Sequence, residues 1–86
     1  MKFAKSSNAK NWGIQIGAFR NKKSAQNQID AAARLVELQI GTVESLKRNG
    51  KTLYRARFNN LSITNAQAAC KALADLPAGC LIVVSN

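Results

Sequence analysis

Histidine is absent from this chain of 86 residues, and acidic residues are scarce, since Asp and Glu together number 4. Without histidine, the chain has no Ser-His or Cys-His catalytic pair and no histidine-ligated metal site. The acidic residues are Asp30, Glu37, Glu44 and Asp75. Their wide spacing gives no sign of a catalytic carboxylate pair. We therefore expect a protein that is not an enzyme and that needs neither a metal nor a cofactor.

Long apolar runs are missing as well. No run reaches the roughly 18 apolar residues needed to span a membrane. Residues 1–11 carry lysines and no apolar stretch, so they do not resemble a signal peptide. We expect residues 1–11 to be a flexible lead-in or linker and residues 12–86 to form one domain. The chain is then either cytoplasmic or a fragment of a longer exported protein.

The scarcity of acids leaves a strongly basic chain. Lys and Arg number 13, which gives a formal net charge of +9. Such a charge favours an anionic partner, which is a nucleic acid, an acidic membrane surface or an acidic polysaccharide. The apolar fraction of 47% is typical of a globular domain. A domain of this length has a thin core, because it buries only about 60–65% of its unfolded surface.

The first half of the chain predicts a strand followed by a helix. Trp12, Ile14 and Ile16 alternate with smaller or polar residues, as in a strand with one buried face. Asn21 is placed to cap a helix, and Gly41 to end it. The apolar stripe expected along that helix is Ala25, Ile29, Ala32 and Val36.

The centre of the chain predicts a hairpin of two strands, residues 42–47 and 52–58. Asn49-Gly50 between them suits a type I′ turn, because both central residues of that turn need positive φ. In the first of these strands, Glu44 and Leu46 share one face. In the second, one face takes the large residues and the other takes Leu53, Arg55 and Arg57.

The last part of the chain predicts a helix and a short strand. Thr64 and Gln67 have the spacing of a capping box at a helix start. Its apolar stripe would be Ala66, Cys70 and Leu73, with Pro77 and Gly79 closing it. Residues 80–84 are nearly all apolar, which favours a strand buried within the sheet.

The order strand, helix, strand, strand, helix, strand predicts an α+β fold of the βαββαβ ferredoxin-like (RNP-like) class. Two right-handed βαβ units build a four-stranded antiparallel sheet with both helices on one face and the first and third strands at its centre. The other face is left bare, so it is a platform for a flat or extended ligand. We expect this platform to carry Gln15, Leu53, Arg55, Arg57, Leu81 and Val83.

The polar side chains on this platform suit a ligand that carries hydroxyl or acetamido groups together with carboxylates or phosphates. The Gln15 amide offers both a donor and an acceptor for hydroxyl and acetamido groups. Arg55 and Arg57 can each grip a carboxylate or a phosphate at two points. The alternative interpretation is that Arg55 and Arg57 are solvated strand residues with no ligand.

Cys70 and Cys80 leave two interpretations open. The predicted packing brings the inner face of the second helix close to the start of the last strand. A disulfide there would stabilise a thin core by roughly 2–3 kcal/mol and would imply an oxidising compartment. The alternative is two buried thiols in a reducing compartment. The even count of cysteines favours the disulfide.

Several segments together resemble the SPOR (sporulation-related repeat) domain over about residues 11–85. These segments are W-G-I-Q-I-G-A-F at 12–19, L-Y-R-A-R at 53–57, A-C-K-A-L at 69–73 and C-L-I-V-V at 80–84. The resemblance implies a non-catalytic domain whose open sheet face binds bacterial peptidoglycan glycan strands, preferentially those stripped of stem peptides. It also implies a domain at the C-terminal end of a longer exported protein, which it would target to the septal wall from the periplasm or cell envelope.

The resemblance also implies which residues contact the glycan. Carried over by position, they are Gln15, Ala18, Leu53, Arg55, Arg57 and Leu81. Ala18 stands where some members have a serine that touches glycan, and Leu53 stands at a position that can be aromatic. F-N-N-L at 58–61 replaces the V-G-P-F of many members, so the turn there is expected to differ.

Two other functions share this predicted topology. An RNA-recognition module is also basic, but it needs exposed aromatic residues on the central strands to stack bases. Here Trp12, Tyr54 and Phe58 take the buried phase of their strands, so we expect no nucleic-acid partner. A ligand-sensing regulatory domain usually pairs across chains, and no aliphatic edge marks such a contact here. We expect a monomer.

Overall fold

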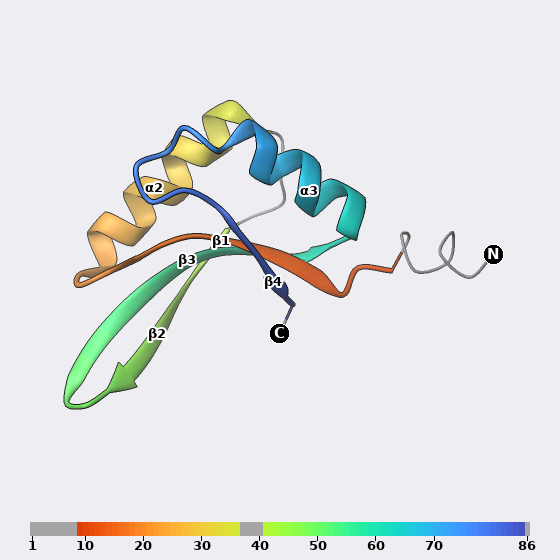
Figure 1. The fold of residues 1–86 in the computed structure, drawn as a ribbon. Coiled ribbons are helices and arrows are strands. Elements are labelled where there is room, and N and C mark those ends of the chain that lie inside the picture. The colour runs from red at the N-terminus through yellow and green to blue at the C-terminus, as the bar shows by residue number, and fades with distance from the viewer. Residues whose placement is uncertain (1–8, 37–40, 86) are drawn as a thin grey trace.

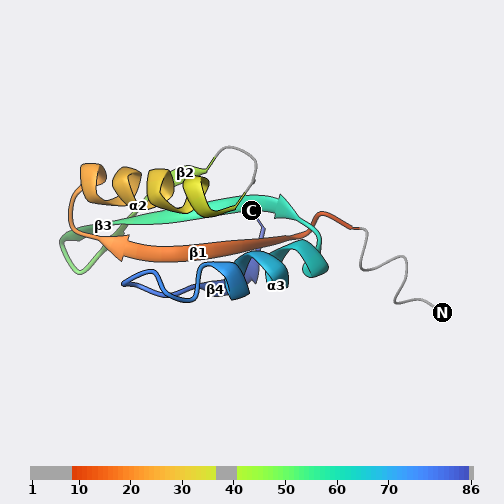
Figure 2. The same cartoon turned by 90° about the horizontal axis from the view of Figure 1, so that it is seen from above.

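The computed structural model describes residues 9–36 and 41–85, and it confirms the predicted fold class and element order. The elements are β1 (Trp12–Phe19), α2 (Lys22–Leu35), β2 (Thr42–Arg48), β3 (Lys51–Leu61), α3 (Ile63–Ala72) and β4 (Leu81–Val84). The strands form one antiparallel sheet in the order β2-β3-β1-β4. Both helices lie on the same side of this sheet, side by side (Figure 1, Figure 2). We call the uncovered side of the sheet the open face.

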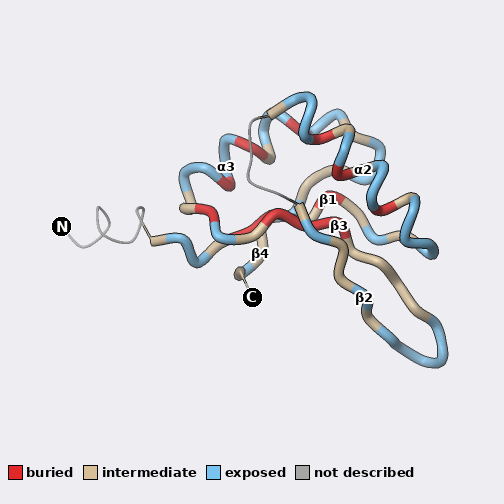
Figure 3. The backbone as a smooth tube through the Cα atoms, turned by 180° about the vertical axis from the view of Figure 1, so that it is seen from behind, coloured by how far each residue is buried: buried red, intermediate tan, exposed pale blue. Residues whose placement is uncertain are grey.

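The core lies between the two helices and the central strands, where the buried residues gather (Figure 3). Ile14 and Ile16 of β1 are fully buried, and Phe58 of β3 is 2% exposed. The helices contribute mostly alanine to this core, including Ala69, which lay outside the apolar stripe expected for the second helix. The buried apolar residues are Ile14, Ile16, Ala25, Ile29, Ala32, Ala56, Phe58, Leu61, Ala66, Ala69 and Leu73.

Helix α2 begins as predicted and ends earlier than predicted. The Asn21 side chain caps it by accepting a hydrogen bond from the Ser24 N–H at 2.8 Å. The helix ends at Leu35, with extended backbone at Val36, so Gly41 does not terminate it. Gly41 has a packing role instead. A Cβ at this position would lie 2.7 Å from Ile29 Cγ2, so only glycine lets the chain pass so close to the core.

Helix α3 is capped by Ser62, so the predicted capping box at Thr64 is wrong. The Ser62 hydroxyl accepts from the Asn65 N–H at 3.1 Å, and the helix starts at Ile63. Ser62 fills the cap position two residues earlier, which places Thr64 inside the first turn. The helix ends at Ala72, so Pro77 and Gly79 lie in the loop beyond it.

Strand β4 lies at an edge of the sheet, which corrects the prediction of a strand buried within it. It pairs with β1 on one side only, because β1 and β3 occupy the centre. Its apolar residues therefore keep contact with solvent. Leu81 is 60% exposed, and Val84 is 68% exposed.

A disulfide joins helix α3 to the chain just before β4. It links Cys70 and Cys80, whose Cα atoms lie 5.2 Å apart, and it closes a loop with a sequence separation of 10. Both cysteines pack against the core. Of the two interpretations of the cysteine pair, the structure has the disulfide.

Candidate functional site

The structure brings all six predicted site residues onto the open face. Gln15 of β1 pairs with Arg57 of β3 on one side and with Leu81 of β4 on the other. Ala18 pairs with Arg55 in the next row of the sheet. Because cross-strand partners share a face and residues two apart in a strand do too, Leu53 lies beside Arg55 on this face.

A β-bulge in β1 makes this arrangement possible. Gln15 and Ala18 are three residues apart, so strict alternation would place them on opposite faces. Ile16 and Gly17 together oppose the single residue Ala56, which restores Ala18 to the side of Gln15. Gly17 has φ 146°, and a Cβ there would lie 2.6 Å from the Phe19 ring. A glycine within a strand pattern is the sequence signal for such a bulge.

A second bulge lies in β3, within the segment F-N-N-L at 58–61. Asn59 and Asn60 together oppose Gly13 of β1, and Asn60 has φ 62°. The segment F-N-N-L is therefore the end of a long strand rather than a separate turn. A Cβ on Gly13 would lie 2.7 Å from the Phe58 carbonyl oxygen, so glycine permits this close approach.

Arg57 is the most buried of the charged groups on the open face, with 4% of the residue exposed. Its Nη1 donates to Glu44 Oε1 of β2 at 3.3 Å, and its Nη2 donates to the Val84 carbonyl oxygen of β4 at 2.8 Å. Arg57 thus links the two edge strands across the open face. Such a guanidinium ties both edge strands to β3 and has little surface left for a ligand.

Glu44 is the residue that the sequence did not assign to the site. Its Oε1 accepts from Arg55 Nη2 at 3.0 Å as well as from Arg57, and its Oε2 accepts from Asn59 Nδ2 at 3.4 Å. One carboxylate therefore orients both arginines. Its strand phase was predicted correctly, but the pairing depends on the register of β2 against β3, which places Glu44 opposite Arg55.

The other side chains of the open face are small, polar or aliphatic. Gln15 is half-buried, Ala18 is exposed, and the Arg55 side chain is 29% exposed. All aromatic side chains in the described part of the chain pack against the core on the opposite side. They are Trp12, Phe19, Tyr54 and Phe58. The open face can therefore hydrogen-bond and attract anions, but it offers no ring for stacking.

Three polar atoms beneath this face have no hydrogen-bond partner among the described residues. They are Arg55 Nε, Arg57 Nε and Asn59 Oδ1. Buried polar groups are normally paired, so each of these lowers stability. They cluster around Glu44, where one carboxylate serves three neighbours. Such a local loss of stability is typical of functional sites, where the residues serve binding rather than folding.

Two other kinds of feature are absent from the described residues. No three His, Cys, Asp or Glu side chains gather there in a group that could hold a metal ion. Within the same residues, no helix is long and apolar enough to cross a membrane.

Comparison with known proteins decides the family. The SPOR domain family matches residues 8–83, which is nearly the whole chain. The chain belongs to the SPOR domain family. Members of this family are known as peptidoglycan-binding domains, and they are binding modules rather than catalytic ones. SPOR domains occur in envelope proteins, and the Cys70–Cys80 disulfide fits an exported protein.

A solved SPOR domain supports the same fold. The crystal structure of the RlpA SPOR domain from Pseudomonas aeruginosa is similar to this chain with a TM-score of 0.73 and 20% sequence identity. The similarity covers 84% of this chain and 96% of that one. Among curated proteins, no match to the chain was found. The SPOR fold is thus retained here although most residues differ from those of RlpA.

Proposed function

We propose that this SPOR domain binds the glycan strands of bacterial peptidoglycan, in particular strands from which the stem peptides have been removed. The observation that carries the proposal is the joint placement of Gln15, Ala18 and Arg55 on one uncovered sheet face. That face is long, open and lined by groups that hydrogen-bond sugars. The domain does no chemistry on its ligand, and it would bring a parent envelope protein to the septal wall, where stripped strands accumulate.

The preference for stripped strands follows from the chemistry of the lactyl group. A stem peptide is attached to the glycan through the lactyl carboxyl, so its removal leaves one free carboxylate per disaccharide. Arg55 and Arg57 against Glu44 leave the open face with a net positive charge. A guanidinium has five N–H donors, so the bond from Arg55 Nη2 to Glu44 leaves donors for a glycan carboxylate.

The open-face residues divide into those that contact the glycan and one that positions the others. We assign direct glycan contact to Gln15, Ala18, Leu53, Arg55 and Leu81, because each has surface on the open face. Arg57 is a positioning residue in this proposal, since it is buried and bonded to Glu44 and to the backbone of β4. It would act on the glycan by holding the sheet in its binding shape.

Co-sedimentation with purified sacculi tests this proposal. The unsubstituted domain, called the parent protein below, should sediment with amidase-treated sacculi and much less with intact ones. The Arg55→Ala variant should lose most of that binding. Arg34→Ala is the matched control, because Arg34 is an exposed arginine in the last turn of α2, on the covered side of the sheet. Equal sedimentation of Arg55→Ala and parent protein would remove Arg55 from the site. Equal binding to both kinds of sacculi would remove the preference for stripped strands.

RNA binding is the alternative that the same topology suggests. The RNA-recognition mode needs exposed aromatic rings on the central strands. In this domain Tyr54 and Phe58 of β3 and Trp12 of β1 pack against the core instead. We therefore favour a glycan ligand, and we place the domain in the periplasm or cell envelope as part of a longer exported protein.

A further inference from the structure

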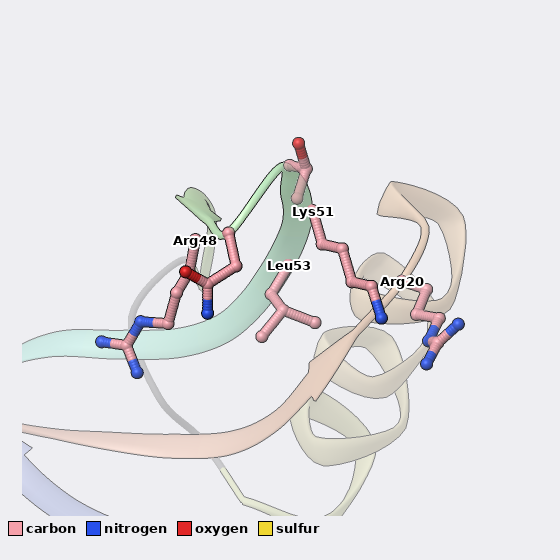
Figure 4. A pocket seen from close by; sticks show the side chains of 6 residues that line it. Arg20, Arg48, Lys51 and Leu53 are labelled. Carbon is pink, nitrogen blue, oxygen red and sulfur yellow. The ribbon is translucent and has the colours of Figure 1, made fainter.

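A second group of cations lies beyond the arginines of the open face, around the turn that joins β2 to β3. Here the chain forms a pocket of about 560 Å³, which we call the hairpin pocket (Figure 4). Its volume falls within the range of about 300–1,000 Å³ that is usual for ligand sites. The residues that line it are Arg20, Arg48, Asn49, Lys51, Thr52 and Leu53.

The charge of the hairpin pocket is positive and not neutralised. Three of its six lining residues are cations, and none of the six is acidic. No carboxylate among the described residues forms an ion pair with Arg20, Arg48 or Lys51, whereas both open-face arginines are bound to Glu44. Like charges held together around a hollow repel one another unless an anion lies between them. The pocket is therefore suited to an anionic group.

The hairpin pocket is continuous with the open face. Leu53 lines the pocket and is also the neighbour of Arg55 on the open side of β3. In the close view, Leu53 lies between the side chain of Arg48 on one side and the side chains of Lys51 and Arg20 on the other (Figure 4). A ligand that leaves Arg55 along β3 therefore reaches the pocket without crossing a covered region.

We propose that the hairpin pocket binds a second carboxylate of the same glycan strand that occupies the open face. This inference rests on the proposed function, since it extends the path of that ligand. A stripped strand is suited to both sites because it carries its carboxylates at regular intervals. The Glu44 cluster orients one segment of the strand, and the pocket attracts the next. The pocket thereby adds three cations to the attraction of the strand.

A pair of double variants with equal net charge tests the inference. Arg48→Gln/Lys51→Gln removes two charges from the pocket, at exposed positions that flank the turn as cross-strand partners. Arg34→Gln/Lys71→Gln removes two charges from the last turns of α2 and α3, on the helical side of the molecule. The probe is a soluble glycan strand, stripped by an amidase and labelled, and its affinity is measured by fluorescence anisotropy across a series of salt concentrations.

The pocket variant should bind the stripped strand about three- to tenfold more weakly than the helix variant, because each lost contact is that of an exposed ion pair. Its affinity should also fall less steeply with salt. Strands whose carboxylates have been converted to neutral amides should bind both variants equally. Arg20→Gln should reproduce the effect from another part of the chain.

Specific results would overturn the inference while leaving the proposed function in place. In one such result, the unsubstituted domain binds the stripped strand and Arg55→Ala does not, but the two double variants bind that strand with equal affinity. Another is a pocket variant that loses attachment only to vesicles of anionic phospholipid, which would make the pocket a membrane contact. A parent protein that binds no stripped strand would overturn the proposed function and the inference together.

Discussion

Glu44 is the residue on which the geometry of the open face depends. Its carboxylate accepts from Arg55, Arg57 and Asn59, and the two guanidinium groups come from neighbouring positions on the same side of β3. Without an anion between them, the two guanidinium groups on one strand face would repel each other and turn outward to be hydrated by solvent. Glu44 therefore acts as an internal counter-ion that keeps Arg55 oriented and Arg57 buried. Its side chain is 23% exposed, so it remains close to any ligand on this face.

Glu44→Gln should lower both stability and glycan affinity. The amide keeps the shape of the side chain but removes the charge that compensates buried Arg57, which should cost about 1–3 kcal/mol. Urea unfolding, followed by circular dichroism, would measure this as a lower midpoint. Ser45→Ala on the same strand is the control, because Ser45 is exposed and should leave the midpoint nearly unchanged. An unaltered midpoint for Glu44→Gln would show that Arg57 does not depend on this partner.

The residues of the open face could be predicted only in part from the sequence. Alternation in β3 placed Leu53, Arg55 and Arg57 on one side correctly, because the opposite side needs large apolar groups. The pairing of Glu44 with the arginines could not be predicted, since it depends on the register between strands, and a shift by one residue moves a side chain to the other face. The burial of Arg57 also depends on the position of β4, whose Val84 carbonyl oxygen accepts from Arg57 Nη2.

At the scale of elements, the bulge in β1 decides which residues accompany Gln15. Alternation alone would send Ala18 toward the core together with Ile14 and Ile16. The extra residue at Gly17 reverses that phase, so Ala18 faces outward and Phe19 packs against the core. The order of the elements followed from periodicity. Periodicity did not predict that α2 ends before Gly41 or that Ser62 caps α3. Several residues near each helix end are able to cap or terminate it.

Gly17→Ala should destabilise the domain more than Gly50→Ala does. Both glycines have positive φ, at 146° and 76°, which strains any other residue. Only at Gly17 does the added Cβ meet other atoms, since it would lie 2.6 Å from the Phe19 ring. We expect a cost of about 2–4 kcal/mol at Gly17 and about 1 kcal/mol at Gly50, measured by urea unfolding. Equal costs would mean that the bulge absorbs the methyl group without strain.

The disulfide joins helix α3 to the chain just before the exposed edge strand β4, so its loss should affect stability more than fold. Cys70→Ser/Cys80→Ser should lower the unfolding free energy by about 2–3 kcal/mol, because the unfolded chain regains the freedom of a short closed loop. Urea unfolding with and without a reductant would measure this. The reductant should lower the midpoint of the parent protein and leave the double variant unchanged. A parent midpoint that ignores the reductant would contradict a stabilising role for the bond.

At the scale of the whole molecule, the net charge of +9 divides into parts with different functions. The open-face cluster of Arg55, Arg57 and Glu44 contributes one net positive charge, because two cations share one anion. The hairpin pocket contributes three cations without a carboxylate. Among the described residues, the other basic side chains lie on helices α2 and α3, just before β1 and in β2, and they are Lys22, Lys23, Arg34, Lys71, Lys10 and Lys47. Charge therefore governs attraction over the whole surface, while the open face supplies the hydrogen bonds that select the ligand.

This division predicts how binding responds to salt. At physiological ionic strength the Debye length is about 8 Å, so attraction from scattered lysines is largely screened, but contacts at close range persist. The parent domain should therefore keep its affinity for stripped glycan at this salt concentration and lose it for single-stranded RNA or polyglutamate of similar charge. Arg55→Ala should bind all three polymers alike at low salt and none of them at physiological salt. If RNA or polyglutamate is bound by the parent as strongly as stripped glycan at physiological salt, charge alone explains the binding and the open face has no selective function.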